Sequence, residues 1–519
     1  MSTGRIAPLG CAAVLASAAL LAVASPALAV DRALGADVPK PVVTGAPWTE
    51  NEIAALDANV DVALAGAKTL RGAHVGILAV DARDGRVLYQ RNPDDAFQPA
   101  STFKLLVGSA ALDKLGPAFA FRTLAYPGGP VADGVLQGPL VLRGGGDVLL
   151  DDKALAELPA ALKAAGIGAV HGVAFDEPRD LPQFLPGWSW DDLPWYYAAP
   201  VTRLGLNDNQ VTLRVTPGAA PGAPLAVSVE PWGTVCAAGA APCAAELGFA
   251  IRVAATTGAA GGASTLDVTR RVAEGPLDEV TLTGTLAAGA KPESLSIAVP
   301  NPPRYAARAA ERALAAAGIR VLPPPSAADA GAAPSSAAPV WSHDSEPLRD
   351  LLADLWLPSD NVLAEELLRA LGATPPAPQG TTAEGIAWEK GWLRRLGVDD
   401  ATLALEDGSG LSGYDRVTPR ALVTVLKHDW DGPHRQIVLD ALPIAGVRGT
   451  LKSSYAGTAA EKRVFAKTGT ISHVSTLAGY AANERHGAVV FAFQVDDWVG
   501  AAADLRELRG RVLSMFVER

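Results

Sequence analysis

The chain has 519 residues, of which 49% are hydrophobic and 19% are charged, and its formal net charge is −11. This length and apolar content suffice for a large core and for more than one ordinary domain. The negative charge, and the lack of any run of Lys or Arg, give nucleic-acid binding no electrostatic support.

The first thirty residues have the pattern of an export signal. Arg5 supplies a positive start, residues 9–27 form an apolar run, and Ala27-Leu28-Ala29 is a small-residue cleavage site. A transmembrane anchor is the alternative, because the apolar run is near spanning length. The Ala-rich composition favours cleavage, so residues 1–29 are predicted to be a signal peptide and the mature protein to be secreted or periplasmic, with no transmembrane segment.

The next part of the chain predicts two helices around a hairpin. Residues 50–66 have helical spacing and an acidic start. Residues 74–82 and 85–92 are predicted to form a β-hairpin across the Arg83-Asp84-Gly85 stretch. A second helix is predicted over 101–115, capped by Ser101 or the residues before it and closed by Gly116.

The middle of the chain, residues 123–339, changes character. Short β-like runs alternate with Gly, Pro and Ala turns, and two helical stretches, 153–165 and 304–318, interrupt them. Residues 323–339 are low in complexity and indicate a linker or an exposed loop. Cys236 and Cys243 are seven residues apart, which predicts a local disulfide in an exported protein, with two free buried thiols as the alternative.

The C-terminal part is predicted to form helices and then a sheet. Helices are expected within 346–372, at 384–396 and at 418–430, and strands at 463–472, 475–483 and 487–497, before a final helix at 501–518. Three consecutive antiparallel strands and a helix favour a sheet covered by helices, which the first hairpin would join. We therefore predict an α/β (α+β) catalytic domain built from residues 30–122 and 340–519, interrupted by one or two small β-rich domains at 123–339.

Three short motifs carry the candidate chemistry: Ser101-Thr102-Phe103-Lys104, Ser359-Asp360-Asn361 and Lys467-Thr468-Gly469-Thr470. Each motif alone is weak, since Ser359 to Asn361 would also suit a helix N-cap and Lys467 an edge strand. Together, in this order, they are the set that active-site serine penicillin-binding proteins and class A β-lactamases carry.

Ser101 and Lys104 are predicted to be a nucleophile and its base. Residues i and i+3 share one face of a helix, and Ser101 lies near a helix start, where free N–H groups favour a developing oxyanion. Lys104 must be neutral to take the Ser101 proton. Burial lowers the pKa of a lysine, and so does a second cation, for which Lys467 is the candidate.

The other two motifs are predicted to complete the site. Ser359 can pass a proton to a leaving amine, and Asn361 can donate to and accept from a peptide amide. Lys467, Thr468 and Thr470 can hold a substrate carboxylate, while Gly469 leaves room for substrate along the strand edge. The N–H groups of Ser101 and Thr470 are expected to form the oxyanion hole.

With these motifs the chain resembles the penicillin-binding protein 4 type of D-alanyl-D-alanine carboxypeptidases/endopeptidases, the low-molecular-mass class C group of peptidase family S13. The resemblance extends over nearly all of the mature chain and rests on eight segments: 99–106, 140–147, 187–192, 343–352, 359–372, 407–419, 442–451 and 466–480. The long interval between the first two motifs is typical of that group and differs from the short one of class A β-lactamases.

The resemblance implies a serine DD-carboxypeptidase or DD-endopeptidase that acts on peptidoglycan stem peptides and crosslinks through a Ser101 acyl-enzyme. It implies no metal or organic cofactor, and β-lactams as covalent inhibitors. Asp192, in Gly-Trp-Ser-Trp-Asp-Asp at 187–192, is expected to pair with the ammonium group of the stem peptide, with a surface turn as the alternative. Val148, Arg448 and His473 depart from the family pattern.

Two rival functions stay open at this point. A β-lactamase or esterase on the same scaffold would turn over penicillin, and a cell-wall binding module with a dead site would not react with it. Other chemistries lack their motifs, because the sequence has no Gly-x-Ser-x-Gly elbow, no P-loop and no His-Glu-x-x-His zinc site. The sequence does not indicate an oligomeric state.

Overall fold

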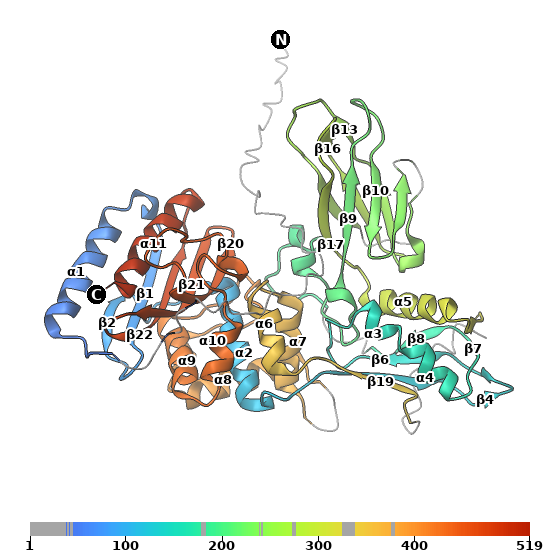
Figure 1. The fold of residues 1–519 in the computed structure, drawn as a ribbon, viewed down its shortest axis with the longest axis horizontal. Helices are drawn as coiled ribbons and strands as arrows, with labels where there is room; N and C mark the ends of the chain where they lie inside the picture. The colour runs from blue at the N-terminus through green and yellow to red at the C-terminus, as the bar shows by residue number, and fades with distance from the viewer. Residues whose placement is uncertain are drawn as a thin grey trace, which may run out of the picture.

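The structure is a computed structural model that describes residues 38, 41, 45–177, 183–237, 239, 242–271, 277–323, 338–374 and 379–518. The predicted signal peptide at 1–29 and nearly all of the low-complexity segment at 323–339 lie outside these residues. The chain folds into a mixture of helices and several separate sheets, which confirms the predicted fold class (Figure 1).

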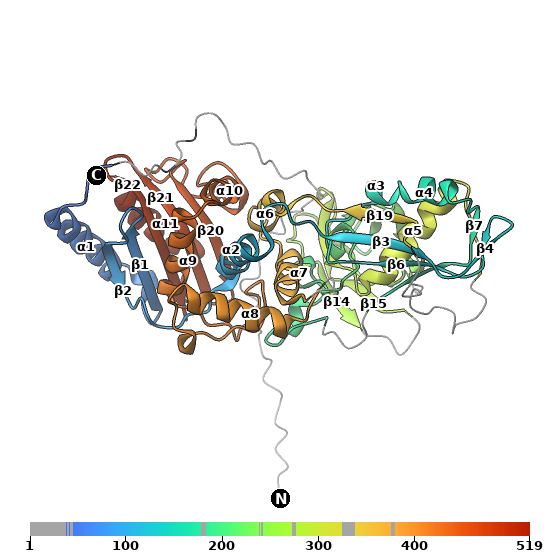
Figure 2. The same cartoon turned by 90° about the horizontal axis from the view of Figure 1, so that it is seen from below.

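A five-stranded antiparallel sheet forms the centre of one end of the molecule (Figures 1 and 2). Its strands, in spatial order, are β2 (Val87–Arg91), β1 (His74–Asp81), β22 (Gly487–Asp496), β21 (Val474–Asn483) and β20 (Val464–Ile471). The predicted hairpin therefore does join the C-terminal strands, since β1 pairs with β22. The edge strand on the opposite side, β20, carries Lys467.

Helices cover both faces of this sheet. Residues of β1 alternate between two cores, with Ile77 packed in one and Leu78 in the other, as the two-residue period of a strand requires. One face is covered by α1 (Glu50–Ala65) and α11 (Ala502–Val517). The other face packs against α9 (Pro419–Asp431). The core on this side also contains residues of α2 (Phe103–Leu115), α6 (Leu348–Trp356), α7 (Asn361–Gly372), α8 (Thr382–Arg395) and α10 (Arg435–Ala441).

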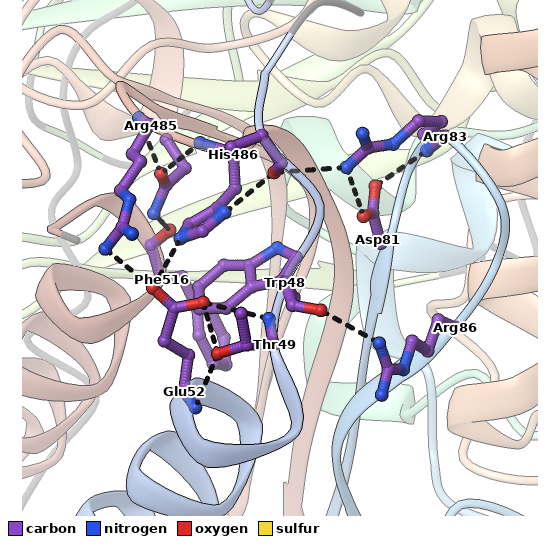
Figure 3. A network of polar contacts seen from close by, with 11 residues as sticks. Trp48, Thr49, Glu52, Asp81, Arg83, Arg86, Arg485, His486 and Phe516 are labelled. Atoms are coloured by element: carbon purple, nitrogen blue, oxygen red, sulfur yellow. Dashed lines mark hydrogen bonds and ion pairs between the residues drawn. The ribbon is translucent and has the colours of Figure 1, made fainter.

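The N-terminal segment before α1 is fastened to the same sheet (Figure 3). Thr49 and Glu52 form a capping box that begins α1, as the acidic start of the helix suggested. Trp48 stacks on His486 with 4.0 Å between ring centroids, and His486 Nδ1 lies 2.8 Å from Ala46 O. Arg86 donates to Trp48 O at 2.8 Å, so the segment is held from both sides.

The part between the first two motifs builds sheets and a core of its own. A mixed sheet contains β3 (Arg122–Pro127), β6 (Leu140–Arg143), β8 (Val173–Phe175) and β19 (Trp341–Asp344), and beside it lie β4 (Val131–Ala132), β5 (Val135–Leu136), β7 (Ala169–Val170) and β18 (Arg320–Val321). Three helices accompany these sheets: α3 (Asp152–Leu155), α4 (Leu158–Ala164) and α5 (Pro302–Ala316).

The remaining strands of this part form smaller sheets. They are β9 (Gln210–Thr216), β10 (Ala226–Glu230), β11 (Thr234–Ala237) and β17 (Glu293–Ala298), then β12 (Ala250–Val253), β14 (Asp267–Arg271) and β15 (Glu279–Thr283), and the pair β13 (Thr256–Gly258) and β16 (Thr285–Ala287). Most of their buried apolar residues join one continuous core that is largely separate from those of the five-stranded sheet, although Ala298 at the end of β17 packs in the core of that sheet and its helices. This separate core supports our proposal that the middle of the chain is an insertion, called the inserted part below.

Cys236 and Cys243 are joined by a disulfide bond, so that prediction is confirmed. The bond links the end of β11 to a residue that pairs with Ile251 of β12. In both views α6 and α7 lie between the five-stranded sheet and the inserted part (Figures 1 and 2). Within the described residues, every helix is too short or too polar to cross a membrane.

Candidate active site

Ser101 lies in the short 3-10 helix η2 (Ala100–Thr102), directly before α2. The predicted capping role is wrong, because Thr102 occupies the N-cap position and no side chain caps this helix. The Ser101 hydroxyl instead accepts a hydrogen bond from Lys104 Nζ at 2.9 Å. Ala100, just before it, has a positive φ of 44°, a costly conformation for a residue with a side chain. The backbone thus holds Ser101 in a tight turn.

Lys104 is fully buried in the first turn of α2, as the apolar sequence around it predicted. Its amine donates to three acceptors: Ser101 Oγ at 2.9 Å, Asn361 Oδ1 at 2.5 Å and Ser409 O at 2.7 Å. Burial lowers the pKa of Lys104 to about 8, against the opposing charges of Asp407, Glu365 and Asp360.

The segment 359–361 forms the turn between α6 and α7. Ser359 has a positive φ of 71°, and the Asp360 carboxylate caps α7 by accepting from Leu363 N at 2.9 Å. Asn361 accepts from Lys104 and donates to Tyr197 O at 2.6 Å. The same turn therefore caps α7 and contributes to the site: Asp360 fixes the start of the helix, while Asn361 binds Lys104 and Ser359 binds Lys467.

Lys467 is fully buried, which a simple edge-strand lysine is not. Its amine donates to Ser359 Oγ at 2.8 Å and to Thr468 O at 2.7 Å. The pKa of Lys467 is lowered well below its usual value, first by burial and then by the charge of Lys104. The two amines, far apart in the sequence, therefore repel each other in one site.

The remaining residues of the third motif line the edge of β20. Thr468 Oγ1 donates to Thr450 Oγ1 at 2.7 Å, and Thr470 is exposed. A Cβ atom at Gly469 would lie 2.8 Å from Pro99 O and 2.9 Å from Ser101 N. The missing side chain thus lets the strand approach the turn that carries Ser101, a closer role than the space for substrate expected from the sequence.

Asp192 is connected to Asn361 of the site through a single residue, Tyr197. It is half-buried at the end of η3 (Trp190–Asp192) and accepts a hydrogen bond from Tyr197 OH at 2.9 Å. Burial raises the pKa of Asp192, and the bond from Tyr197 opposes that shift. Since Tyr197 O binds Asn361, the inserted part places this carboxyl group beside the candidate site.

Sequence reasoning missed the loop at 407–412, whose Ser409 carbonyl binds Lys104. Glu365 accepts from the N–H groups of Gly408 and Ser409, at 2.8 to 3.0 Å. Asp407 accepts from Gly410 N at 2.7 Å, from Ser412 N at 2.8 Å and from Trp188 Nε1 at 2.9 Å. The only sequence feature that indicated this loop is segment 407–419 of the family resemblance, because a backbone carbonyl has no sequence signature.

The three residues that depart from the family pattern are each packed in the core or bound to a backbone carbonyl group. Val148 is fully buried in the core. Arg448 is also buried and donates to Leu442 O at 3.0 Å, at the end of α10. His473 lies in the β20–β21 turn with a positive φ of 62°, and its Nδ1 is 3.0 Å from Trp498 O.

The segments 101–104, 359–361, 407–412 and 467–470 thus meet around the amines of Lys104 and Lys467. The arrangement offers a nucleophile, a buried amine that can take its proton, and a second amine beside a second hydroxyl. Among the side chains that the structure describes, no group of three or more His, Cys, Asp or Glu residues is placed to hold a metal ion.

Comparisons with known proteins find relatives over most of the chain. The chain matches the D-Ala-D-Ala carboxypeptidase 3 (S13) family over residues 56–512. It is 35% identical to a D-alanyl-D-alanine carboxypeptidase of Actinomadura sp. (strain R39), over 79% of this chain and 76% of the relative. It is 28% identical to the D-alanyl-D-alanine carboxypeptidase DacB of Haemophilus influenzae, over 84% of this chain and 88% of the relative.

A solved structure extends the similarity to the whole fold. The crystal structure of penicillin binding protein 4 (dacB) from Haemophilus influenzae superposes with a TM-score of 0.73 at 27% identity, and covers 89% of this chain and 100% of that one. A second crystal structure of that protein, in complex with a novel β-lactam, superposes with a TM-score of 0.70 at 25% identity.

Proposed function

The chain belongs to the D-Ala-D-Ala carboxypeptidase 3 (S13) family, and from this premise we propose that it is a serine-type D-Ala-D-Ala carboxypeptidase and DD-endopeptidase whose nucleophile is Ser101. One observation carries the assignment of residues. The Ser101 hydroxyl lies 2.9 Å from a fully buried amine, that of Lys104, with a pKa of about 8. Such an amine is neutral often enough at physiological pH to act as a base.

In the first step, neutral Lys104 takes the proton of Ser101 as Oγ attacks the carbonyl carbon before the terminal D-alanine. The N–H groups of Ser101 and Thr470 stabilise the oxyanion that forms. The bond to the leaving amine then breaks, and Ser359 passes a proton to that amine and takes one from the Lys467 ammonium group to which it is bonded. Water attacks the resulting ester and gives a proton back to Lys467 through Ser359. The Ser101 Oγ–acyl bond breaks, and Lys104 returns its proton to Ser101.

The repulsion between the two lysines decides which of them is the base. At neutral pH the pair binds fewer than two protons, because burial lowers the pKa of both lysines and the charge of Lys104 lowers that of Lys467 further. A substrate carboxylate bound beside Lys467 and Thr468 favours the proton on Lys467. Substrate binding therefore leaves Lys104 neutral, next to the hydroxyl that it has to deprotonate.

The substrates that fit this site are peptidoglycan stem peptides and their crosslinks, and β-lactams are expected to acylate Ser101 and remain bound. Asn361 can align the peptide amide, while Thr470 and Gly469 contact it along β20. For the mature chain we propose a secreted or periplasmic location after cleavage behind Ala29.

The direct test is the Ser101→Ala variant. It is expected to lose labelling by a fluorescent penicillin and release of D-alanine from a diacyl-Lys-D-Ala-D-Ala peptide, with an unchanged melting temperature. Labelling that survives in the variant would assign the nucleophile to another residue. Rapid turnover of the penicillin by the wild type, in place of a lasting adduct, would favour a β-lactamase instead.

Asp192 is proposed to pair with the free ammonium group of the stem peptide. Asp192→Asn should lower kcat/KM for ammonium-bearing peptides by about tenfold, the range of a partly exposed charge pair, and leave peptides with an acylated amine unaffected. Asp191→Asn is the matched control, because Asp191 is the exposed neighbour. Equal losses on both kinds of peptide would make Asp192 a structural residue.

A further inference from the structure

A carboxyl group of the inserted part faces the second motif of the site. Asp208 lies in η5 (Asn207–Asn209), which packs against α7, and its carboxyl group lies within hydrogen-bonding reach of that of Asp360, the residue between Ser359 and Asn361. Asp208 Oδ1 is buried, and no N–H or O–H group among the described contacts donates to it. Two carboxyl groups can share a hydrogen bond only if one of them carries the proton.

The surroundings put that proton on Asp208. Asp360 accepts N–H groups of Val362 and Leu363 at the start of α7 and faces Lys104, all of which favour its ionised form. Asp208 has the Gln210 amide as a donor, at 2.7 Å. Its pKa is raised well above the ordinary value by burial and by the charges of Asp360 and Asp354.

Both sides of this contact have strained backbones. Asn207, Asp208 and Asn209 have φ values of 51°, 57° and 52°, and Ser359 has a φ of 71°. A left-handed conformation is unfavourable for a residue with a side chain, and it persists where the surroundings determine it. Here Asp208 N donates to Val148 O at 2.7 Å and Asn209 Nδ2 to Pro200 O at 3.0 Å. The inserted part therefore presents the Asp208 carboxyl group from a fixed loop.

We propose that Asp208 is a positioning residue for the reaction: its carboxylic acid donates a hydrogen bond to the Asp360 carboxylate and so holds Ser359 and Asn361 against the two lysines. This inference rests on the proposed function of those residues. In this way the inserted part helps to position the residues of the site, as long as Asp208 keeps its proton.

The proposal has a pH dependence. When Asp208 loses its proton, two carboxylates face each other and the turn is pushed away from the lysines. The groups that face the pair come from each neighbouring element: Asp354 of α6, Tyr196 of the 3-10 helix η4 (Tyr196–Ala198), Gln210 of β9 and Lys104 of α2. A neutral side chain that still donates a hydrogen bond should resist this loss.

The experiment compares Asp208→Asn with Asp208→Leu by the rate constant of acylation by a fluorescent penicillin. At about pH 7 the asparagine variant, which keeps a donor, should acylate within about twofold of wild type, and the leucine variant about tenfold more slowly or worse, the usual cost of an unsatisfied buried charge. Asp429→Asn and Asp429→Leu are matched controls, since Asp429 is a buried carboxyl group bound to Ser109. They should leave the acylation rate at the wild-type value.

The pH profile makes the test independent of whether the leucine variant folds. The ratio of the Asp208→Asn rate to the wild-type rate should rise with pH across the range in which wild type loses the proton of Asp208, because only wild type has this proton to lose. A ratio that falls as the pH rises, an asparagine variant well below wild type at about pH 7, or a folded leucine variant at the wild-type rate would overturn the proposal. Wild-type protein that is not acylated at all would contradict the proposed function instead.

Discussion

A lysine is a base only where its ammonium form is disfavoured, and the surroundings of Lys104 act in both directions. Burial removes water from the amine, while Asp407, Glu365 and Asp360 supply negative charge that favours the proton. Three acceptors around Nζ match the three N–H bonds of an ammonium group. The balance, a pKa of about 8, leaves a neutral fraction at neutral pH together with a firmly oriented amine.

This balance predicts a pH profile and a severe Lys104→Arg effect. Acylation should rise as the pH increases through about 8, because below that pH Lys104 holds a proton and has no lone pair for Ser101. Arginine cannot be deprotonated in proteins, so the variant should acylate about a thousandfold more slowly, the scale of a lost general base. The measurement is the acylation rate constant of each protein across the pH range.

Lys114→Arg is the matched control, because Lys114 lies on the same helix and binds Leu371 O instead of a motif residue. It should keep the wild-type rate and profile. An acylation rate that does not change with pH, or a Lys104→Arg variant near the wild-type rate, would remove Lys104 as the base.

At the scale of elements, the site depends on how closely β20 approaches the turn before α2. Gly469→Ala would place a methyl group 2.8 Å from Pro99 O, 2.9 Å from Ser101 N and 2.2 Å from Thr476 Oγ1. The first two contacts are with backbone and cannot be relieved by a rotamer change. The strand and the turn must separate, which should cost about 1–3 kcal/mol in the free energy of unfolding.

Acylation of this variant should fall by about a hundredfold, since Ser101 moves relative to the oxyanion donors. Gly391→Ala in α8 is the control, because its methyl group would meet only Arg395 Nη1, at 3.7 Å. In a helix this exchange should raise stability by about 0.5–1 kcal/mol and leave acylation unchanged. Denaturant unfolding and penicillin acylation check both variants, and a Gly469→Ala protein with normal acylation would exclude the close-approach role.

The elements that the sequence predicted are those with a strong local signal. The strands of the hairpin and of β20 to β22 follow from short apolar runs bounded by turn residues, and the helices α6 and α7 from the helical stretch at 346–372. The helix α10 was missed because it is short and no side chain caps it at His434. The three motifs indicated the site residues, but Ser409 contributes only a carbonyl group, which any residue has.

The pairing of Asp208 with Asp360 lay equally beyond the sequence. Nothing local marks Asp208, which stands between two asparagines in a turn-forming run, and its partner belongs to a different part of the chain. The Ser101 cap was predicted wrongly for a related reason. A serine at a helix start favours capping locally, but the contact with Lys104 uses the hydroxyl.

Across the whole molecule, the site lies where the inserted part meets the five-stranded sheet and its helices. Contacts between the two include Trp188 with Asp407 and Tyr197 with Asn361, besides the carboxyl pair described above. Each of these residues of the inserted part lies in a loop or a short 3-10 helix near the site. The cores are largely separate, although Val148, Ala199 and Ala298 of the inserted part pack in the core of the helices. Away from these three residues, the stability of the inserted part and the geometry of the site are therefore expected to respond to different substitutions.

The disulfide provides a way to test this separation. Cys236 and Cys243 close a loop of seven-residue separation in the inserted part, and replacing both by alanine should lower its free energy of unfolding by about 2–3 kcal/mol, from the chain entropy that the bond removes. Acylation at a temperature where the variant is folded should stay at the wild-type rate, because none of the site contacts comes from β11 or β12. Calorimetry should show the unfolding transition of the inserted part at a lower temperature. The unfolding transition of the part that contains Ser101, which can be recognised because penicillin acylation stabilises it, should not move. A single transition that shifts as a whole, with slower acylation, would instead mean that the two parts unfold as one unit and that the bond supports the site directly.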